Sequence, residues 1–284
     1  MATFEAQVEG LTGIAIDGSS SPTQNELTEY LKDGVRDVTN KFVASVPESI
    51  KDFLRESAEQ TSNEFETGRA KIATVLRETG VDGDWRNCRE VPANLQSRVV
   101  DSNSLHYASK FNPAYCILNK GKISVFPTPN SSANAFKVYY VNNNPVNGSG
   151  SSLVYSHDDI DYFPTDKIYL VVTYAAIKSL ENALAAIGSI PTIQGGSDEL
   201  TDVTSGTITS AETDYDEWFH VAGQFIEDEE DEELATLQIQ KINSYLEAFK
   251  AQNQANISNQ AHFQLRHAIL SKQYNSAFGK KSEE

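Results

Sequence analysis

The chain has 284 residues and a formal net charge of −17, from 40 acidic and 23 basic residues. An acidic surface repels phosphate, which disfavours a nucleic-acid binder that works by releasing counterions. No apolar run approaches the roughly 18 residues of a membrane helix. Residues 1–18 also lack the basic segment and long apolar stretch of a secretory signal, so we expect neither a membrane protein nor a secreted one.

The N-terminal part is predicted to be a flexible arm over residues 1–22, followed by a helix. Thr23 and Glu26 have the spacing of a capping box, in which each residue satisfies a backbone N–H of the other. Apolar residues then recur every three or four positions, which predicts an amphipathic helix over 25–45. These residues are Leu27, Leu31, Val35, Val38 and Phe42.

The middle of the chain has a strand-like pattern. Alternation over 72–77 predicts a strand, and residues 136–141 predict another. Two short apolar runs, 115–118 and 123–126, flank a Gly-containing turn and predict a hairpin. A small antiparallel β region is therefore expected to be inserted at about 69–142.

A long buried helix is predicted over Asp166–Ile187. It follows Pro164, and its apolar residues cover so much of its girth that we expect it to lie inside the core. Residues 191–211 are rich in Gly, Ser and Thr, which predicts an exposed loop. A second long helix is expected from near Asp214.

This last helix contains seven consecutive acids at 227–233, and its apolar seam ends at Phe249. We therefore expect the main domain to span 23–249 and residues 250–284 to form an extended interaction tail. The tail has its own stripe at helical spacing: Phe263, His267, Leu270, Tyr274 and Phe278. A short isolated helix is marginal in water, so the stripe needs a surface. Two surfaces stay open: the same subunit, or a partner to which the stripe docks.

The fold class that follows is α+β. It consists of a mainly helical body with a long buried helix, an inserted small antiparallel β region with a hairpin, and the extended C-terminal tail.

The residue patterns predict no catalytic residue, metal site or cofactor. Phosphate-loop, dinucleotide, nucleophile-elbow and zinc-protease motifs are all missing from the sequence. The acids at 227–233 lack the central Gly of a calcium loop, and they are either solvated or in contact with a basic partner. A cation cluster at His157–Asp161 is the less favoured alternative to a polar lead-in for the buried helix. Cys88 and Cys116 are expected to be reduced thiols, with a single bridge as the alternative.

Four stretches together resemble the head-to-tail adaptor (neck or connector) proteins of tailed bacteriophages, especially the marine-phage type. They are Leu27–Val35, the hairpin segment Tyr115–Pro129, Phe163–Leu180 and Ile226–Tyr245. The resemblance implies a non-enzymatic virion protein, made in the host cytoplasm, that forms a ring below the portal and joins the capsid vertex to the tail. It implies as partners the portal, neighbouring subunits in a twelve-fold ring, and tail or nozzle proteins. DNA would pass through the channel without specific binding, and no membrane is involved.

Four functions remain open at this stage. Beside the adaptor ring, the chain could be another neck completion protein or a tail or fibre module that binds a surface through tyrosines such as Tyr139, Tyr140 and Tyr174. It could also be an enzyme with scattered active-site residues, although no motif supports one. On the adaptor hypothesis, the stripe at 263–278 would dock on the portal or on a neighbouring subunit.

Overall fold

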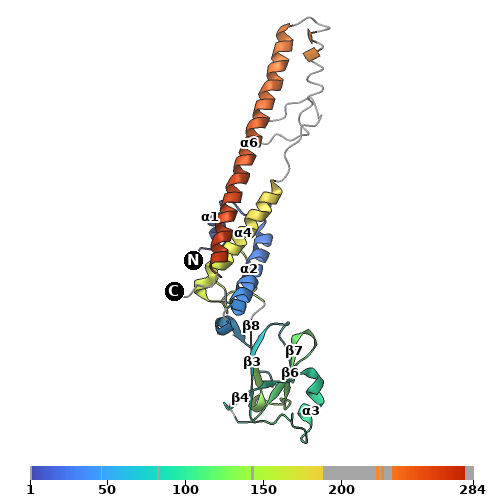
Figure 1. The fold of residues 1–284 in the computed structure, drawn as a ribbon. Helices are drawn as coiled ribbons and strands as arrows, with labels where there is room; N and C mark the ends of the chain where they lie inside the picture. Colours follow the sequence, from blue (N-terminus) through green and yellow to red (C-terminus); the bar gives the residue numbers. More distant parts are fainter. Residues whose placement is uncertain are drawn as a thin grey trace.

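The computed structural model describes residues 2–45, 47–81, 83–141, 144–187, 222–223, 225–226 and 232–278. It confirms the α+β class. Figure 1 shows an elongated molecule with a helical body in its middle, a β domain at one end and a long C-terminal helix that extends past the body at the other. The predicted loop at 191–211, the start of the helix near Asp214 and most of the acidic run lie outside the described residues.

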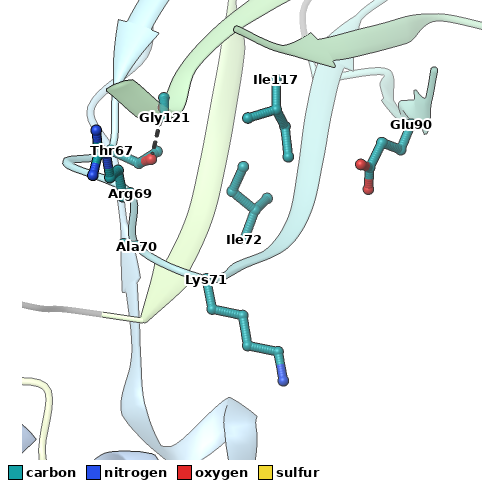
Figure 2. A pocket seen from close by; sticks show the side chains of 8 residues that line it. All are labelled: Thr67, Arg69, Ala70, Lys71, Ile72, Glu90, Ile117 and Gly121. Atoms are coloured by element: carbon teal, nitrogen blue, oxygen red, sulfur yellow. Dashed lines mark hydrogen bonds between the residues drawn. The ribbon is translucent and has the colours of Figure 1, made fainter. Parts of the chain in front are cut away.

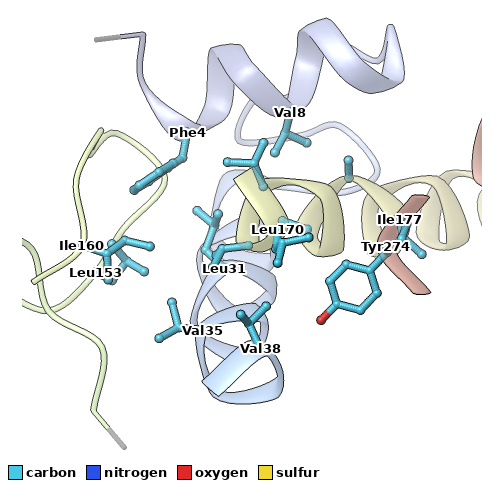
Figure 3. Close-up of a cluster of buried hydrophobic side chains, with 14 of the residues drawn as sticks. Phe4, Val8, Leu31, Val35, Val38, Leu153, Ile160, Leu170, Ile177 and Tyr274 are labelled. Carbon is cyan, nitrogen blue, oxygen red and sulfur yellow. The ribbon is translucent and has the colours of Figure 1, made fainter. Parts of the chain in front are cut away.

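Four helices build the body: α1 (Phe4–Thr12), α2 (Gln24–Ser45), α4 (Ile168–Ala186) and α6 (Glu232–Ser276). Helix α4 lies at the centre and contacts the other three. Ten of its residues are buried, including Leu180, which is fully buried. The prediction of a long buried helix over 166–187 is therefore confirmed, and Figure 3 shows how the side chains of the other elements surround Leu170 and Ile177.

The predicted start of α2 is confirmed in detail. The backbone N–H of Thr23 donates to Oε2 of Glu26 at 2.7 Å, and the backbone N–H of Glu26 donates to Oγ1 of Thr23 at 3.3 Å. These bonds satisfy donors that a helix start would otherwise leave free. Further along, Gly34 lets α2 approach α4, since a Cβ there would lie 3.2 Å from the carbonyl oxygen of Val171.

The predicted flexible arm over residues 1–22 is wrong. Residues 4–12 form α1, whose Phe4 and Val8 are fully buried in the core of the body. The side chain of Thr3 accepts a hydrogen bond from the backbone N–H of Ala6 at the helix start. The backbone N–H of Phe4 donates to the carbonyl of His157 at 2.8 Å, which ties this helix to the segment before α4. With nine residues and only two buried apolar side chains, the helix is too short to be indicated from the sequence.

The β domain contains two four-stranded sheets. The first has the order β1-β8-β3-β4, and the second has the order β2-β7-β6-β5. All pairs are antiparallel except β5 with β6. The strands are β1 (Leu54–Glu56), β2 (Glu64–Glu66), β3 (Ile72–Glu78), β4 (Trp85–Asn87), β5 (Arg89–Glu90), β6 (Ala114–Ile117), β7 (Lys122–Phe126) and β8 (Phe136–Val141). Six buried residues of the two sheets and Cys88, between β4 and β5, form their shared core.

The predicted strands and hairpin are confirmed, but the β region begins at Leu54 rather than near residue 69. The added strands, β1 and β2, have only three residues each, too few to give an alternating pattern. Short helical turns connect the elements: η1 (Pro47–Phe53), η2 (Ala93–Leu95), α3 (Gln96–Val100), η3 (Asn119–Gly121), η4 (Ser132–Asn134) and η5 (Thr165–Lys167).

The division between a domain ending at 249 and a tail over 250–284 is also corrected. Helix α6 runs without a break from Glu232 to Ser276 and returns to the body at its C-terminal end, beside α4 and the N-terminus (Figure 1). The end of the apolar seam at Phe249 therefore does not mark the end of the helix.

Candidate functional site

The predicted docking stripe lies against its own subunit. Leu270 and Tyr274 are only 7% and 4% exposed, and both belong to the core of the helical body. Phe263 and Phe278 pack against the same core. The expectation that this stripe docks on another subunit is thus corrected for these side chains. We call residues 263–278 the C-terminal clasp, because they close the core formed by α1, α2 and α4.

A polar network fixes the end of the clasp. The hydroxyl of Tyr274 donates to Oδ2 of Asp37 at 2.5 Å, and Nζ of Lys41 lies 2.8 Å from the same oxygen. Nζ of Lys41 also lies 4.5 Å from the centre of the Tyr274 ring. Burial, and then the hydrogen bond to Asp37, raise the pKa of Tyr274 well above its usual range. The folded state therefore stabilises the neutral phenol of Tyr274 over the phenolate.

A second contact involves the remaining stripe residue, His267. Its Nε2 lies 3.3 Å from Oε1 of Glu181 on α4, and Nζ of Lys178 lies 2.7 Å from Oε2 of the same carboxylate. Burial raises the pKa of Glu181, but the hydrogen bonds and charges of Lys178 and His267 outweigh it, so this pKa lies below its ordinary value. The guanidinium of Arg266 donates to the carbonyl of Leu11 at 2.9 Å and so holds α1.

Helix α6 also carries large apolar side chains that face solvent, two of which, Leu265 and Ile269, lie within the clasp on its exposed side. Ile257 is 51% exposed and Leu265 is 61% exposed. The others that are exposed on this helix are Leu234, Leu237, Ile239 and Ile269. A monomer gains nothing from such side chains in water, so this helix is a candidate contact surface.

A second exposed apolar group lies at the end of the β domain, which the sequence analysis did not single out. We call residues 100–112, which run from the last residue of α3 towards β6, the tip loop. Leu105 is fully exposed, with a relative accessibility of 103%, and Phe111 is 63% exposed. Val100 and Tyr107 are exposed as well. The only signal in the sequence was the presence of isolated large apolar residues in a polar stretch.

The backbone of the tip loop is held in place by hydrogen bonds. The guanidinium of Arg89 donates to the carbonyls of His106, at 2.5 Å, and Tyr107, at 3.3 Å. The backbone N–H of Ala108 donates to the carbonyl of Val99 at 2.9 Å, and both of these residues are buried. The exposure of Leu105 therefore results from a defined backbone and not from a loop without contacts.

A third feature is an open cavity of about 400 Å³ at the side of the β domain. Figure 2 shows Ile72 and Ile117 facing each other across it, while Arg69, Lys71 and Glu90 lie at separate places around its rim. We call it the isoleucine slot. Its charged groups do not converge on one point, so the slot offers a small apolar surface rather than an acid–base pair.

The sulfur and acidic groups do not form a reactive site among the described residues. Cys88 and Cys116 are buried free thiols, and burial raises the pKa of Cys88 to about 12. No group of three or more His, Cys, Asp or Glu side chains in the described part of the chain is placed to hold a metal ion. Asp159 instead accepts a hydrogen bond from the backbone of Gly148 at 2.9 Å, as expected for a polar lead-in to α4.

The tyrosines do not form one platform. Tyr139 and Tyr140 lie on β8, and the ring of Tyr140 packs 5.8 Å from that of Phe65. Tyr174 lies on α4, in the helical body, with its ring 5.8 Å from that of Tyr274. The rings therefore serve two separate cores.

The search for known relatives gives no guide to function. No protein-family model matches the chain, and no curated protein matches it significantly. Among the described residues, none of the helices combines the length and the apolar character that crossing a membrane requires.

Proposed function

We propose that the chain is a structural virion protein, a head-to-tail adaptor that forms a ring below the portal and joins the capsid vertex to the tail. The resemblance in sequence motivates the proposal. The observation that carries it is the arrangement of a compact helical body between two ends of different construction, a long helix at one end and a β domain at the other (Figure 1). A subunit that connects two different structures needs two different ends.

The length of α6 supports this role. At about 1.5 Å per residue its 45 residues span roughly 68 Å. Only the clasp, at the C-terminal end of this helix, belongs to the core of the body. The preceding part carries the exposed Leu237 and Ile257 and has no acid between residues 248 and 262. Such a helix suits packing against neighbouring subunits of a ring or against the portal, both of which bury apolar side chains.

The charge of the chain suits passage of DNA. With 40 acidic against 23 basic residues, a ring of these subunits has a strongly negative total charge. A negative channel wall repels phosphate, so the DNA slides without binding. The partners we propose are accordingly the portal, neighbouring adaptor subunits, and tail or nozzle proteins, with no enzymatic step, no cofactor and no membrane.

The first test is the mass of the assembly. The purified full chain should be measured by light scattering and native mass spectrometry, alone and with the purified portal of the same virion. We expect a closed ring, twelve-fold by resemblance, that co-migrates with the portal. The portal mixed with serum albumin, another acidic protein, is the control for non-specific association. A chain that stays monomeric at micromolar concentration in the presence of portal would exclude the adaptor function.

A further inference from the structure

One exposed side of α6 follows a period of seven residues. Leu234 and Ile269 are five such periods apart, and Leu237 and Leu265 are four apart. Each of these four side chains is at least 40% exposed. We call Leu234, Leu237 and the positions that follow either of them by multiples of seven the outer row, which ends at Lys272; all of its positions are exposed or half-buried. A period of seven is the pattern of helices that coil around each other.

The outer row has the same pattern when it is read from either end. Around Ala251 at its centre, Leu234 has Ile269 as its counterpart, and Leu237 has Leu265. In an antiparallel pair of helices, the first residues of one lie beside the last residues of the other. Two copies of α6 that cross at Ala251 therefore place large apolar side chains against each other at both ends. This is the contact that a twofold axis generates between identical chains, and an unrelated partner would not require the symmetry.

The middle of the outer row has small side chains, which correspond in pairs as well. Ser244 has Ser258 as its counterpart, and Ala248 has Ala255. Small side chains let two helices approach closely, because the distance between helix axes depends on the residues at the contact. At about 1.5 Å per residue, the row from Leu234 to its last large apolar residue covers roughly 53 Å. Its length exceeds the three to four heptads that are typical of a coiled coil.

The charges of α6 favour the antiparallel orientation over the parallel one. The helix begins with Glu232 and Glu233 and carries Lys272 near its end. A parallel pair would place the two acidic ends together and each Lys272 against the other. An antiparallel pair places each Lys272 beside the acidic first turn of the other copy, where opposite charges attract. Lys241 then lies near His262, and a polar layer of this kind fixes the register at a cost in stability.

We propose that α6 pairs with α6 of a second copy of the chain through the outer row, as an antiparallel coiled coil whose twofold axis lies near Ala251. Leu270 and Tyr274 stay packed in the core of their own subunit, so the clasp is kept. Subunits of a closed ring are related by rotation about its axis, and their copies of α6 do not run in opposite directions. The dimer is therefore the state of the chain before it meets a portal. The proposal does not depend on the adaptor function, because it follows from α6 alone.

Sedimentation velocity of the full chain without portal, over a range of concentrations, is the first test. We expect a dimer. Leu237→Asp combined with Leu265→Asp should raise its dissociation constant at least tenfold, while the far-ultraviolet circular dichroism spectrum stays that of a folded subunit. Ile239→Asp is the matched control, because Ile239 is 43% exposed on the same helix but lies outside the outer row. A wild-type chain that is monomeric or forms a larger ring, or an equal effect of the control, would overturn the proposal.

Crosslinking between introduced cysteines tests the orientation. A short bismaleimide should link two copies in an equilibrated mixture of the Ser244→Cys and Ser258→Cys variants. Neither variant alone should be linked, because its two cysteines would lie about 21 Å apart along the antiparallel pair. The wild type is the control for Cys88 and Cys116, which are buried. Linking of either single variant to itself, or no link in the mixture, would refute the antiparallel pair, whether or not the chain forms a ring on the portal.

Discussion

Single side chains decide how tightly the clasp is held. Tyr274 combines a buried ring with a hydroxyl that must find a partner, and Asp37 provides it. Asp37 also forms an ion pair with Lys41, so the side chains of Asp37, Lys41 and Tyr274 meet between α2 and α6. Such a network is strong when complete and weak when one member is removed, because the others remain partly buried.

Tyr274→Phe is expected to lower the free energy of unfolding by about 1–2 kcal/mol near neutral pH, because it removes a hydrogen bond to a charged group. The raised pKa of Tyr274 stabilises the fold fully below its ordinary value of 10.0, and this contribution is lost as pH rises beyond that value. Urea unfolding from pH 8 to 11 should thus show a steeper loss for the wild type than for the variant. Tyr169→Phe, at an exposed position, is the control and should behave like the wild type.

Gly34 and Gly10 lie at two helical positions where the effect of one added methyl group on stability can be compared. Glycine inside a helix usually costs about 0.5–1 kcal/mol relative to alanine. Gly10→Ala in α1 meets nothing within 4 Å and should raise the melting temperature. Gly34→Ala should lower it, because the new Cβ would lie 3.1 Å from the ring of Tyr174 and 3.2 Å from a backbone oxygen that cannot move freely. If both variants are stabilised, α2 and α4 lie further apart than described.

At the scale of elements, the clasp behaves as part of the body and not as an appendage. Its Leu270 and Tyr274 are buried by α2 and α4, while α1 is tied to it by the bond from Arg266 to Leu11. The sequence of the stripe shows only that residues 263–278 need a surface, since the pattern is the same whether the surface belongs to one subunit or to another. The choice depends on tertiary contacts between residues more than 200 positions apart, such as Asp37 and Tyr274.

Truncation after Gln260 is accordingly expected to destabilise the subunit strongly. It removes two buried large side chains and two partly buried ones, at about 1.5–3 kcal/mol for each that is fully buried. This is a large part of the 5–15 kcal/mol typical of a domain. Circular dichroism melting should show a drop of many degrees or no folded state, whereas truncation after Phe278 should melt like the wild type. A truncated chain with an unchanged melting temperature would mean that the clasp is dispensable.

The elements that the sequence predicts well are those with strong local patterns. The hairpin around Gly121, the strand at 136–141 and the helix of Leu180 appear with nearly the expected bounds. The missed elements, α1 and the strands β1 and β2, are short and gain their stability from burial against distant parts of the chain. The tip loop was missed for a similar reason, because exposure of Leu105 is a property of the folded surface.

At the scale of the whole molecule, two groups of exposed apolar side chains lie at distant places, the tip loop and helix α6. The tip loop belongs to the β domain at one end of the molecule, and α6 extends past the body at the other end (Figure 1). On the proposed function, the two places have different partners. Changes in one should then leave the contacts of the other intact.

Ile257→Asp combined with Leu265→Asp is expected to reduce self-association or portal binding at least tenfold, since each places a charge where an apolar contact would be buried. Leu105→Asp should leave that same association unchanged. Sedimentation velocity over a range of concentrations measures both variants in one experiment. If the charged pair on α6 assembles as the wild type does, the exposed part of this helix is not the contact between subunits.

The clasp also has a consequence for the order of events during synthesis. Residues 54–141 form the β domain from one continuous stretch, so it can fold while translation proceeds. The core of the body, in contrast, needs Leu270 and Tyr274 from the last part of the chain. Residues 263–278 must therefore have been made before the body closes. We expect chains that end before residue 263 to lack the finished surface on which assembly depends, so that they do not enter it.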